Sequence, residues 1–330
     1  MKKAFRAGFV LFLALAASDL LRAQSFSPPF APPGQRGGPA PAQEPTSAQG
    51  PAPDLAFGAY QRGYYMTAFR EAMKRIAANP KDAAAMTLIG EIYRDGYAVR
   101  QDQGEAARWY RLAGALGDRE AEFALGVLLL NGAPGVDKDR TGAKAEFEKA
   151  AAQGQAGALY NLGVMAIEGD ATGKPDFAKA ADYFRRAAEA GDGNGAYSYG
   201  VLLREGRGVP LDITESAHWL KRAADGGIIA GQVEYAIMLF NGVGVEKNEA
   251  AAAKIFLSAA AHNNPIAQNR LAHLYVTGRG VPRDLVEAAT WNRFAKAAGV
   301  EDPELDAATA NLTPEENARV NQLVRRQAEF

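Results

Sequence analysis

The chain has 330 residues, a formal net charge of −1 and no cysteine. Without cysteine it can form neither disulfides nor thiolate metal sites, so its fold must rely on packing. Its Lys and Arg residues form no basic stripe of the kind that indicates a nucleic-acid-binding protein.

Residues 1–23 predict a secretory signal peptide. Three cations occur within the first six residues, an apolar run follows from Gly8 to Ala17, and a cleavage site is expected near Ala23. The run is short for a transmembrane helix, so an uncleaved N-terminal anchor is the less favoured alternative. We expect a periplasmic or secreted protein with no membrane span after signal cleavage.

Residues 24–53 hold nine of the 17 prolines of the chain, mixed with Gly, Ala, Gln and Ser. Such a segment buries too little apolar surface to order itself, so it predicts a disordered Pro-rich linker. The alternative is a polyproline ligand for a partner; the plain spacer is favoured.

Residues 54–82 form an atypical first unit. Tyr60, Gly63, Tyr65 and Ala68, followed by Asn79-Pro80, resemble the end of a tetratricopeptide unit. We expect a tetratricopeptide-like N-terminal capping unit.

From residue 83 to residue 299 the sequence repeats every 36 or 37 residues, in six copies. Each copy has a small residue, a loop glycine six residues later and a short polar residue after the loop. The small residues are Gly90, Gly126, Gly163, Gly200, Ala236 and Ala272; the loop glycines are Gly96, Gly132, Gly169, Gly206, Gly242 and Gly278; the polar residues are Asp102, Asp139, Asp176, Asp212, Asn248 and Asp284. A period of this length predicts a stack of supersecondary units.

Each copy predicts two helices. Apolar residues at helical spacing mark a first helix, called helix A, as in Ala156 to Ile167. A glycine-containing turn then ends it, and the short polar residue caps the second helix, helix B. In three copies a Glu follows three residues later, as Glu215 follows Asp212, which resembles a capping box. Helix B carries Ala-Ala steps and an aromatic such as Trp109, Trp219 or Trp291, which we expect to fill the space between helices.

The pattern Ala-x-x-x-Leu-Gly-x-x-Tyr-x-x-Gly-x-Gly-Val-x-x-Asp-x-x-x-Ala-x-x-Trp-x-x-x-Ala-Ala-x-x-Gly resembles the Sel1-like repeat, a longer-looped relative of the tetratricopeptide repeat. The resemblance implies an all-α fold, a right-handed α/α superhelical solenoid of helix pairs, whose members mostly offer binding surfaces to other proteins. The third copy departs from the pattern, because Gly169-Asp-Ala-Thr-Gly173-Lys-Pro175 replaces its Gly-x-Gly-Val loop. After residue 299, Thr313-Pro-Glu-Glu316 predicts the start of a C-terminal capping helix within residues 300–330.

The sequence argues against catalysis. It has three histidines, of which His218 and His262 are expected on the surface of helix B and His273 has no visible set of metal-ligand partners. The Gly-x-Gly loops recur in nearly every copy and lack a third glycine, so turns are favoured over phosphate cradles. We therefore expect no enzyme activity, no cofactor and no metal.

The remaining candidate is the concave groove that the A helices line in stacked helix pairs. Its exposed positions should lie three before, one after, and four or five after the small residue. The candidate partner-binding residues are Arg94, Phe123, Asn131, Tyr160, Tyr197, Arg204, Phe240, Asn241 and His273. Aromatic and Arg anchors of this kind are typical of protein or peptide sites. For Phe123, Tyr160 and Tyr197 the alternative of packing between adjacent A helices is equally favoured.

These patterns predict an exported, periplasmic interaction module that acts as a scaffold or regulator of an envelope protein and is monomeric. The alternative is an envelope enzyme or binder that acts on a cell-wall-derived ligand. Self-assembly through an exposed repeat face is a third, less favoured possibility.

Overall fold

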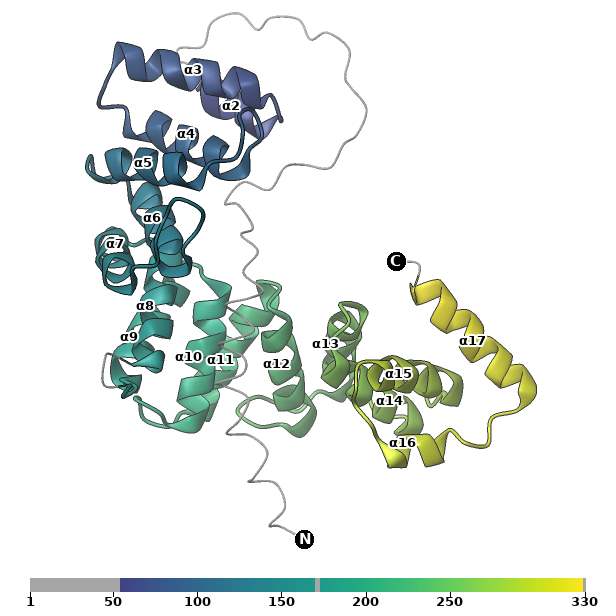
Figure 1. Cartoon of the computed structure of the whole chain (residues 1–330). Helices are drawn as coiled ribbons and strands as arrows, with labels where there is room; N and C mark the ends of the chain where they lie inside the picture. The colour runs from purple at the N-terminus through teal and green to yellow at the C-terminus, as the bar shows by residue number, and fades with distance from the viewer. Residues whose placement is uncertain (1–53, 170–172, 329–330) are drawn as a thin grey trace, which may run out of the picture. The chain divides into compact units, whose positions relative to one another are not determined.

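The computed structural model describes residues 54–169 and 173–328 (Figure 1). The predicted signal peptide and Pro-rich linker lie outside these residues. The described part contains sixteen helices and no β-strand, which confirms the all-α prediction. Two compact units divide the chain, Met1–Ala158 and Leu159–Phe330, and each is described by itself.

Consecutive helices pair along the chain in both units. The helices of the N-terminal unit are α2 (Leu55–Gln61), α3 (Tyr65–Ala78), α4 (Ala83–Asp95), α5 (Gln103–Gly114), α6 (Arg119–Asn131) and α7 (Arg140–Ala152), and α8 (Ala156–Glu168) crosses the boundary. The helices of the C-terminal unit are α9 (Phe177–Glu189), α10 (Gly193–Glu205), α11 (Ile213–Asp225), α12 (Ile229–Asn241), α13 (Glu249–Ala261), α14 (Pro265–Thr277), α15 (Leu285–Ala297), α16 (Pro303–Ala308) and α17 (Pro314–Ala328). The A helices of the six copies are α4, α6, α8, α10, α12 and α14.

The short polar residue of each copy joins its two helices, as Asp212 illustrates. Its carboxylate accepts the backbone N–H of Glu215 and caps α11, as predicted. Its own backbone N–H donates to the carbonyl of Leu203 in α10. That N–H is therefore already bonded within the pair, and Glu215 accepts from the indole N–H of Trp219 at 2.6 Å instead of completing a capping box. One residue thus fixes both the end of helix A and the start of helix B.

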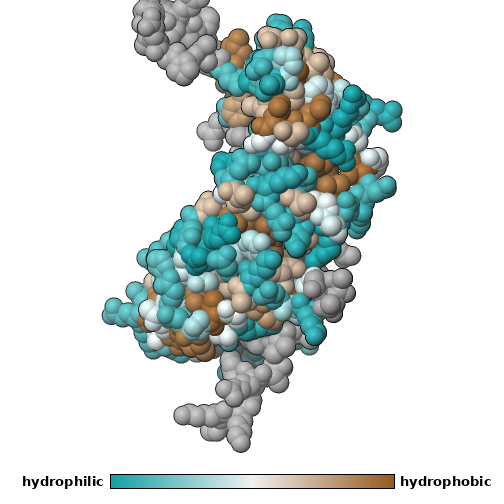
Figure 2. Space-filling view, turned by 90° about the vertical axis from the view of Figure 1, so that its left-hand side faces the viewer, coloured by the Kyte–Doolittle hydropathy of each residue, from teal (hydrophilic) through white to brown (hydrophobic). Residues whose placement is uncertain are grey.

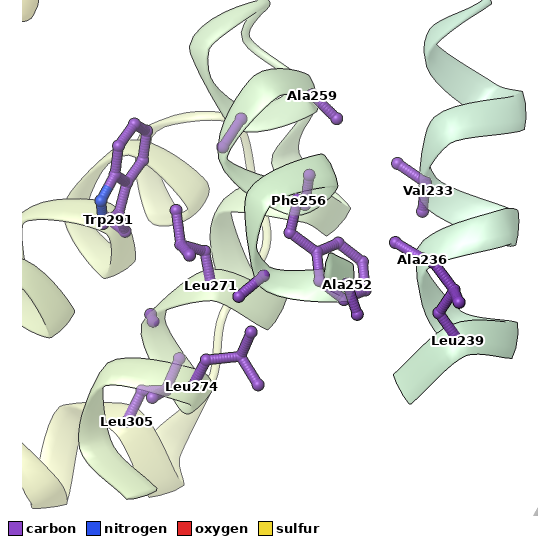
Figure 3. Packing of buried hydrophobic residues seen from close by; sticks show 14 residues of the cluster. Val233, Ala236, Leu239, Ala252, Phe256, Ala259, Leu271, Leu274, Trp291 and Leu305 are labelled. Carbon is purple, nitrogen blue, oxygen red and sulfur yellow. The ribbon is translucent and has the colours of Figure 1, made fainter. Parts of the chain in front are cut away.

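The small residue of helix A lets a large side chain of helix B approach closely. A methyl group on Gly90 would lie 2.5 Å from the ring of Tyr110, and one on Gly163 would lie 2.5 Å from the ring of Phe184. The residue that fills this space is therefore one position after the predicted aromatic, since Tyr110 follows Trp109. The equivalent residues are Phe147, Leu220 and Phe256. Figure 3 shows the ring of Phe256 directed toward α12 in the core of the C-terminal unit.

In the last three copies the loop after helix A packs on the preceding helix pair. Gly208 has a φ of +74°, and a methyl group on it would overlap the main chain of Phe177 at the start of α9. Beside it the guanidinium carbon of Arg207 lies 3.9 Å from the centroid of the Phe177 ring. Gly244 approaches Ile213 at the start of α11 in the same way. The second loop glycine is thus needed for contact between copies as well as for the turn.

Each end of the described chain carries a helix pair outside the six copies. At the start, Arg75 of α3 binds the carboxylates of Asp54 at 2.6 Å and Asp82 at 2.8 Å, which ties α2, α3 and the cap of α4 together. At the end, α17 starts with a reciprocal capping box between Thr313 and Glu316. The short helix α16 before it was not predicted. The capping roles of these terminal residues stay predictions.

Candidate functional site

The residues at the four predicted groove positions of each A helix are called here the A-helix face. In the C-terminal unit, one of its charged side chains binds to the next A helix. Arg204 of α10 contacts Glu234 of α12, with 2.5 Å between its guanidinium nitrogen and the carboxylate oxygen. The two side chains are only 21% and 15% exposed. Arg204 therefore links two neighbouring repeats.

His273 has a similar role at the end of the repeats. Its Nε2 lies 2.8 Å from the carboxylate of Asp302, which also accepts a hydrogen bond from Asn269 at 2.8 Å. Asp302 caps α16 as well, through the backbone N–H of Leu305. Partial burial opposes ionisation of Asp302, but the hydrogen bonds from Asn269, His273 and Leu305 prevail and lower its pKa to about 2. His273 thus anchors the short helix that follows the last repeat.

The two tyrosines of the predicted groove lie mainly inside the packing. Tyr160 is 5% exposed, and its ring centroid lies 5.6 Å from that of Phe184. Burial, together with the charge of Asp192, raises the pKa of Tyr160 to about 12. Tyr197 is half-buried, and burial followed by the charge of Glu234 raises its pKa to about 12. Tyr160 therefore packs inside the fold, as the alternative to a partner-binding role predicts.

In the N-terminal unit, Arg94 belongs to a polar network across three helices. It binds Glu91 at 2.5 Å and Asp95 at 2.8 Å, and its side chain is 11% exposed. Tyr110 of α5 donates to Glu91 at 2.8 Å, and Tyr60 of α2 donates to Asp95 at 3.2 Å. Burial raises the pKa of Glu91. The expectation that Arg94 faces solvent is therefore not met, because its charge is paired with two carboxylates of α4 that also accept hydrogen bonds from the neighbouring helices α2 and α5.

Phe123 of α6 packs between helices in the same unit. Its ring centroid lies 6.0 Å from that of Phe147, and a methyl group on Gly157 at the start of α8 would lie 2.8 Å from its ring. The half-buried ring therefore covers the next A helix, as the packing alternative describes.

Two asparagines of the A-helix face are exposed. Asn131 ends α6 and Asn241 ends α12, where its amide donates to the carbonyl of Ile237 at 2.9 Å. Each follows a half-buried apolar residue, Leu130 and Phe240 respectively. The guanidinium carbon of Arg279 lies 4.1 Å from the centroid of the Phe240 ring, so the guanidinium covers one face of that ring.

These apolar and amide groups can contact a polypeptide, because an amide side chain both donates and accepts hydrogen bonds. No group of His, Asp and Glu that could hold a metal ion occurs within residues 54–169 and 173–328. Sequence reasoning missed Glu234 and Asp302 as binding partners of the predicted site residues Arg204 and His273. Asp302 gave a usable signal, since an Asp directly before Pro303 is a typical helix start.

A family model described as Sel1 repeat matches residues 83–118, 119–155, 156–192, 194–228, 229–264 and 265–300. The chain belongs to the Sel1 repeat family. The six predicted repeats are thereby confirmed. Sel1 repeats generally mediate protein–protein interaction, so the family supports a protein partner.

Two solved structures are similar to this chain. A Sel1 repeat protein from Oxalobacter formigenes is 30% identical, with a TM-score of 0.65 over 74% of this chain and 98% of that one. The c5321 protein, a protective antigen present in uropathogenic Escherichia coli strains displaying an SLR fold, is 24% identical, with a TM-score of 0.52 over 83% of this chain and 67% of that one. Both support a solenoid of Sel1 helix pairs. A search among curated proteins found no match.

None of the helices within residues 54–169 and 173–328 has both the length and the apolar character needed to span a membrane.

Proposed function

We propose that this Sel1 repeat protein is an exported interaction module that holds or regulates another protein of the bacterial cell envelope. Export is supported by the basic, apolar and small-residue pattern of residues 1–23. The partner would contact the A-helix face of one or both units.

The observation that carries this proposal is the recurrence of an apolar residue followed by an exposed Asn at the end of an A helix. Leu130 and Asn131 form this pair in α6, and Phe240 and Asn241 form it in α12. The apolar side chain offers surface that is removed from water when a partner binds. The amide can form hydrogen bonds with the main chain of a bound segment. Arg94 and Arg204 act behind this surface, because their charges are bound to carboxylates of the same chain.

The test is co-purification from the native cell envelope with the tagged chain, in which Asn241→Arg is compared with Ser258→Arg. Both positions are exposed, but Ser258 lies on helix B α13. We expect a partner that is enriched with the wild type and with Ser258→Arg and lost from Asn241→Arg. If both variants lose the partner equally, the A-helix face is not the binding surface. If no protein is enriched even with the wild type, the chain is not an interaction module.

Export has its own measurement. N-terminal sequencing of the chain from the envelope fraction should begin close to Gln24. A chain that retains Met1 would contradict cleavage of the predicted signal peptide.

A further inference from the structure

Two tyrosine rings meet at the surface of the N-terminal unit. Tyr65 is the first residue of α3 and Tyr97 lies in the loop after α4; their ring centroids are 4.3 Å apart and their planes are inclined by only 21°. Hydrophobic side chains reach the surface in separate patches between hydrophilic ones (Figure 2), and Tyr97 is 51% exposed. This contact, called here the Tyr65–Tyr97 stack, joins the N-terminal helix pair to the first repeat where small molecules can reach it.

The stack occupies a position that the repeat pattern defines. Tyr97 follows the loop glycine Gly96 as Arg207 follows Gly206, and Arg207 covers the ring of Phe177, the first residue of the helix before α10. The contact between the loop and the start of the preceding helix therefore serves packing in both places. Among the six copies, the first is the one in which both positions are tyrosines.

The geometry of the stack suits oxidative coupling. A tyrosyl radical holds its unpaired electron in the π system of the ring, largely on the oxygen and on the ring carbons beside the hydroxyl-bearing carbon. Nearly parallel rings in contact let these orbitals overlap face to face. Neither hydroxyl of the stack has a hydrogen-bond partner within residues 54–169 and 173–328, so no such bond restrains the two rings. Burial, followed by the neighbouring Tyr97 and Asp95, raises the pKa of Tyr65, which therefore reacts as the neutral phenol.

Two further tyrosines lie close to Tyr65 without this geometry. The ring centroid of Tyr60 is 5.3 Å away, but the rings meet edge to face at 71°, so their π orbitals overlap little. The Tyr60 hydroxyl donates to Asp95, and the residue is buried. Tyr64 is 63% exposed but has no ring contact in the described part of the chain. Proximity alone would select these two residues, whereas face-to-face contact selects Tyr97.

We propose that Tyr65 and Tyr97 are a site of oxidative cross-linking, where a haem peroxidase acting with hydrogen peroxide joins them as dityrosine. Each phenol loses one electron and one proton, and the two radicals couple through a carbon–carbon bond between ring positions beside the hydroxyl-bearing carbons. In each ring the hydrogen of the coupled carbon then moves to the oxygen, which restores the phenol. The two electrons and two protons released reduce one hydrogen peroxide to two molecules of water.

The product is a covalent link between the N-terminal helix pair and the first repeat. The chain has no cysteine, so a disulfide cannot supply such a link. Like a disulfide, the cross-link would stabilise the fold chiefly by restricting the unfolded chain between residues 65 and 97. This inference goes beyond the proposed function, because neither ring belongs to the A-helix face and the cross-link forms whether or not an envelope partner is bound.

The test treats the purified chain, at low micromolar concentration, with hydrogen peroxide and a peroxidase, followed by trypsin and mass spectrometry. Trypsin cuts after each Arg, so Tyr65 lies in the peptide of residues 63–70 and Tyr97 in the peptide of residues 95–100. We expect these two peptides to be joined, two hydrogen atoms lighter than their sum, and to show dityrosine fluorescence. The same treatment in urea should give much less of the joined peptide, because the stack is lost on unfolding.

Conservative variants identify the rings that react. Tyr65→Phe and Tyr97→Phe should each abolish the joined peptide, since phenylalanine keeps the ring but forms no phenoxyl radical. Tyr64→Phe is the matched control, because it alters the same tryptic peptide outside the stack and should leave the yield unchanged.

The proposal is overturned if the wild type gives no joined peptide, or if the peptide persists in Tyr65→Phe and is lost from Tyr64→Phe. An equal yield in urea would also overturn it, because the folded stack would then not direct the coupling. A joined peptide found only in covalent dimers would overturn it as well, since the coupling would occur between molecules.

Discussion

The α-carbon of Gly208 lies against the main-chain carbonyl of Phe177, the first residue of the helix B that belongs to the preceding repeat. The approach is so close that a single methyl group would overlap that carbonyl. Because helix B begins there, the loop of one repeat is packed on the start of a helix of its neighbour.

Gly208→Ala should therefore destabilise the fold for two reasons. Its φ of +74° costs about 1–2 kcal/mol for a residue with a Cβ, and the overlap with Phe177 adds a further cost of about 1–3 kcal/mol. Gly227→Ala is the matched control, because its φ is +82° and nothing lies within 4 Å of the added carbon. Urea unfolding of both variants separates the two contributions. If both variants lose the same free energy of unfolding, the overlap with Phe177 costs nothing and the prediction is wrong.

The carboxylate of Asp302 should make stability depend on acid pH. Its pKa is lowered from 3.8 to about 2 in the folded chain, so the folded state favours its charged form. The stabilisation is present above about pH 4 and is lost as the pH falls toward 2. With allowance for solvent screening, we expect about 1 kcal/mol. Asp302→Asn keeps a helix cap and should lack this contribution, measured as the difference between the two unfolding curves across that window. Parallel curves would contradict the role of Asp302.

Tyr160 is expected to act in folding rather than in direct partner binding. Tyr160→Ala should cost about 3–5 kcal/mol because the side chain is 5% exposed, whereas Tyr160→Phe should cost about 1 kcal/mol. Thermal and urea unfolding measure both. If the Tyr160→Ala protein stays fully stable and loses only its partner, Tyr160 belongs to the binding surface and the prediction is wrong.

The ion pair between Arg204 and Glu234 should be energetically coupled. A double-mutant cycle with Arg204→Met and Glu234→Gln is expected to give about 1–2 kcal/mol, because both side chains are largely shielded from water. The control pair is Lys221 with Asp225, at 52% and 64% exposed, for which we expect about 0.5 kcal/mol or less. Equal coupling energies in the two cycles would mean that the first pair does not link its repeats.

The sequence predicted the helices well because their signals are local. Asp212 caps α11 through its own side chain, and the loop glycines recur at fixed positions, so neither depends on a distant residue. Arg204 and His273 were harder, since their partners lie about thirty residues away in other helices. Arg204 meets Glu234, and nothing in the repeat pattern marks Glu234 because the equivalent positions of other copies differ. The six-residue helix α16 lies outside the repeat period and was not predicted, although Asp302 before Pro303 is a local helix-start signal.

Each loop contact reaches back by a single helix pair, as Gly208 does to Phe177, Gly244 to Ile213 and Gly280 to Glu249. A duplicated copy of 36 or 37 residues inserted between two others would bring its own loop glycine and its own helix start. The loop glycine of the new copy would pack on the helix B start of the preceding copy, and the loop glycine of the following copy would pack on the helix B start of the new one. The loop contacts therefore allow the number of repeats to change by whole copies through internal gene duplication, whereas a copy inserted between α10 and α12 would separate Arg204 from Glu234.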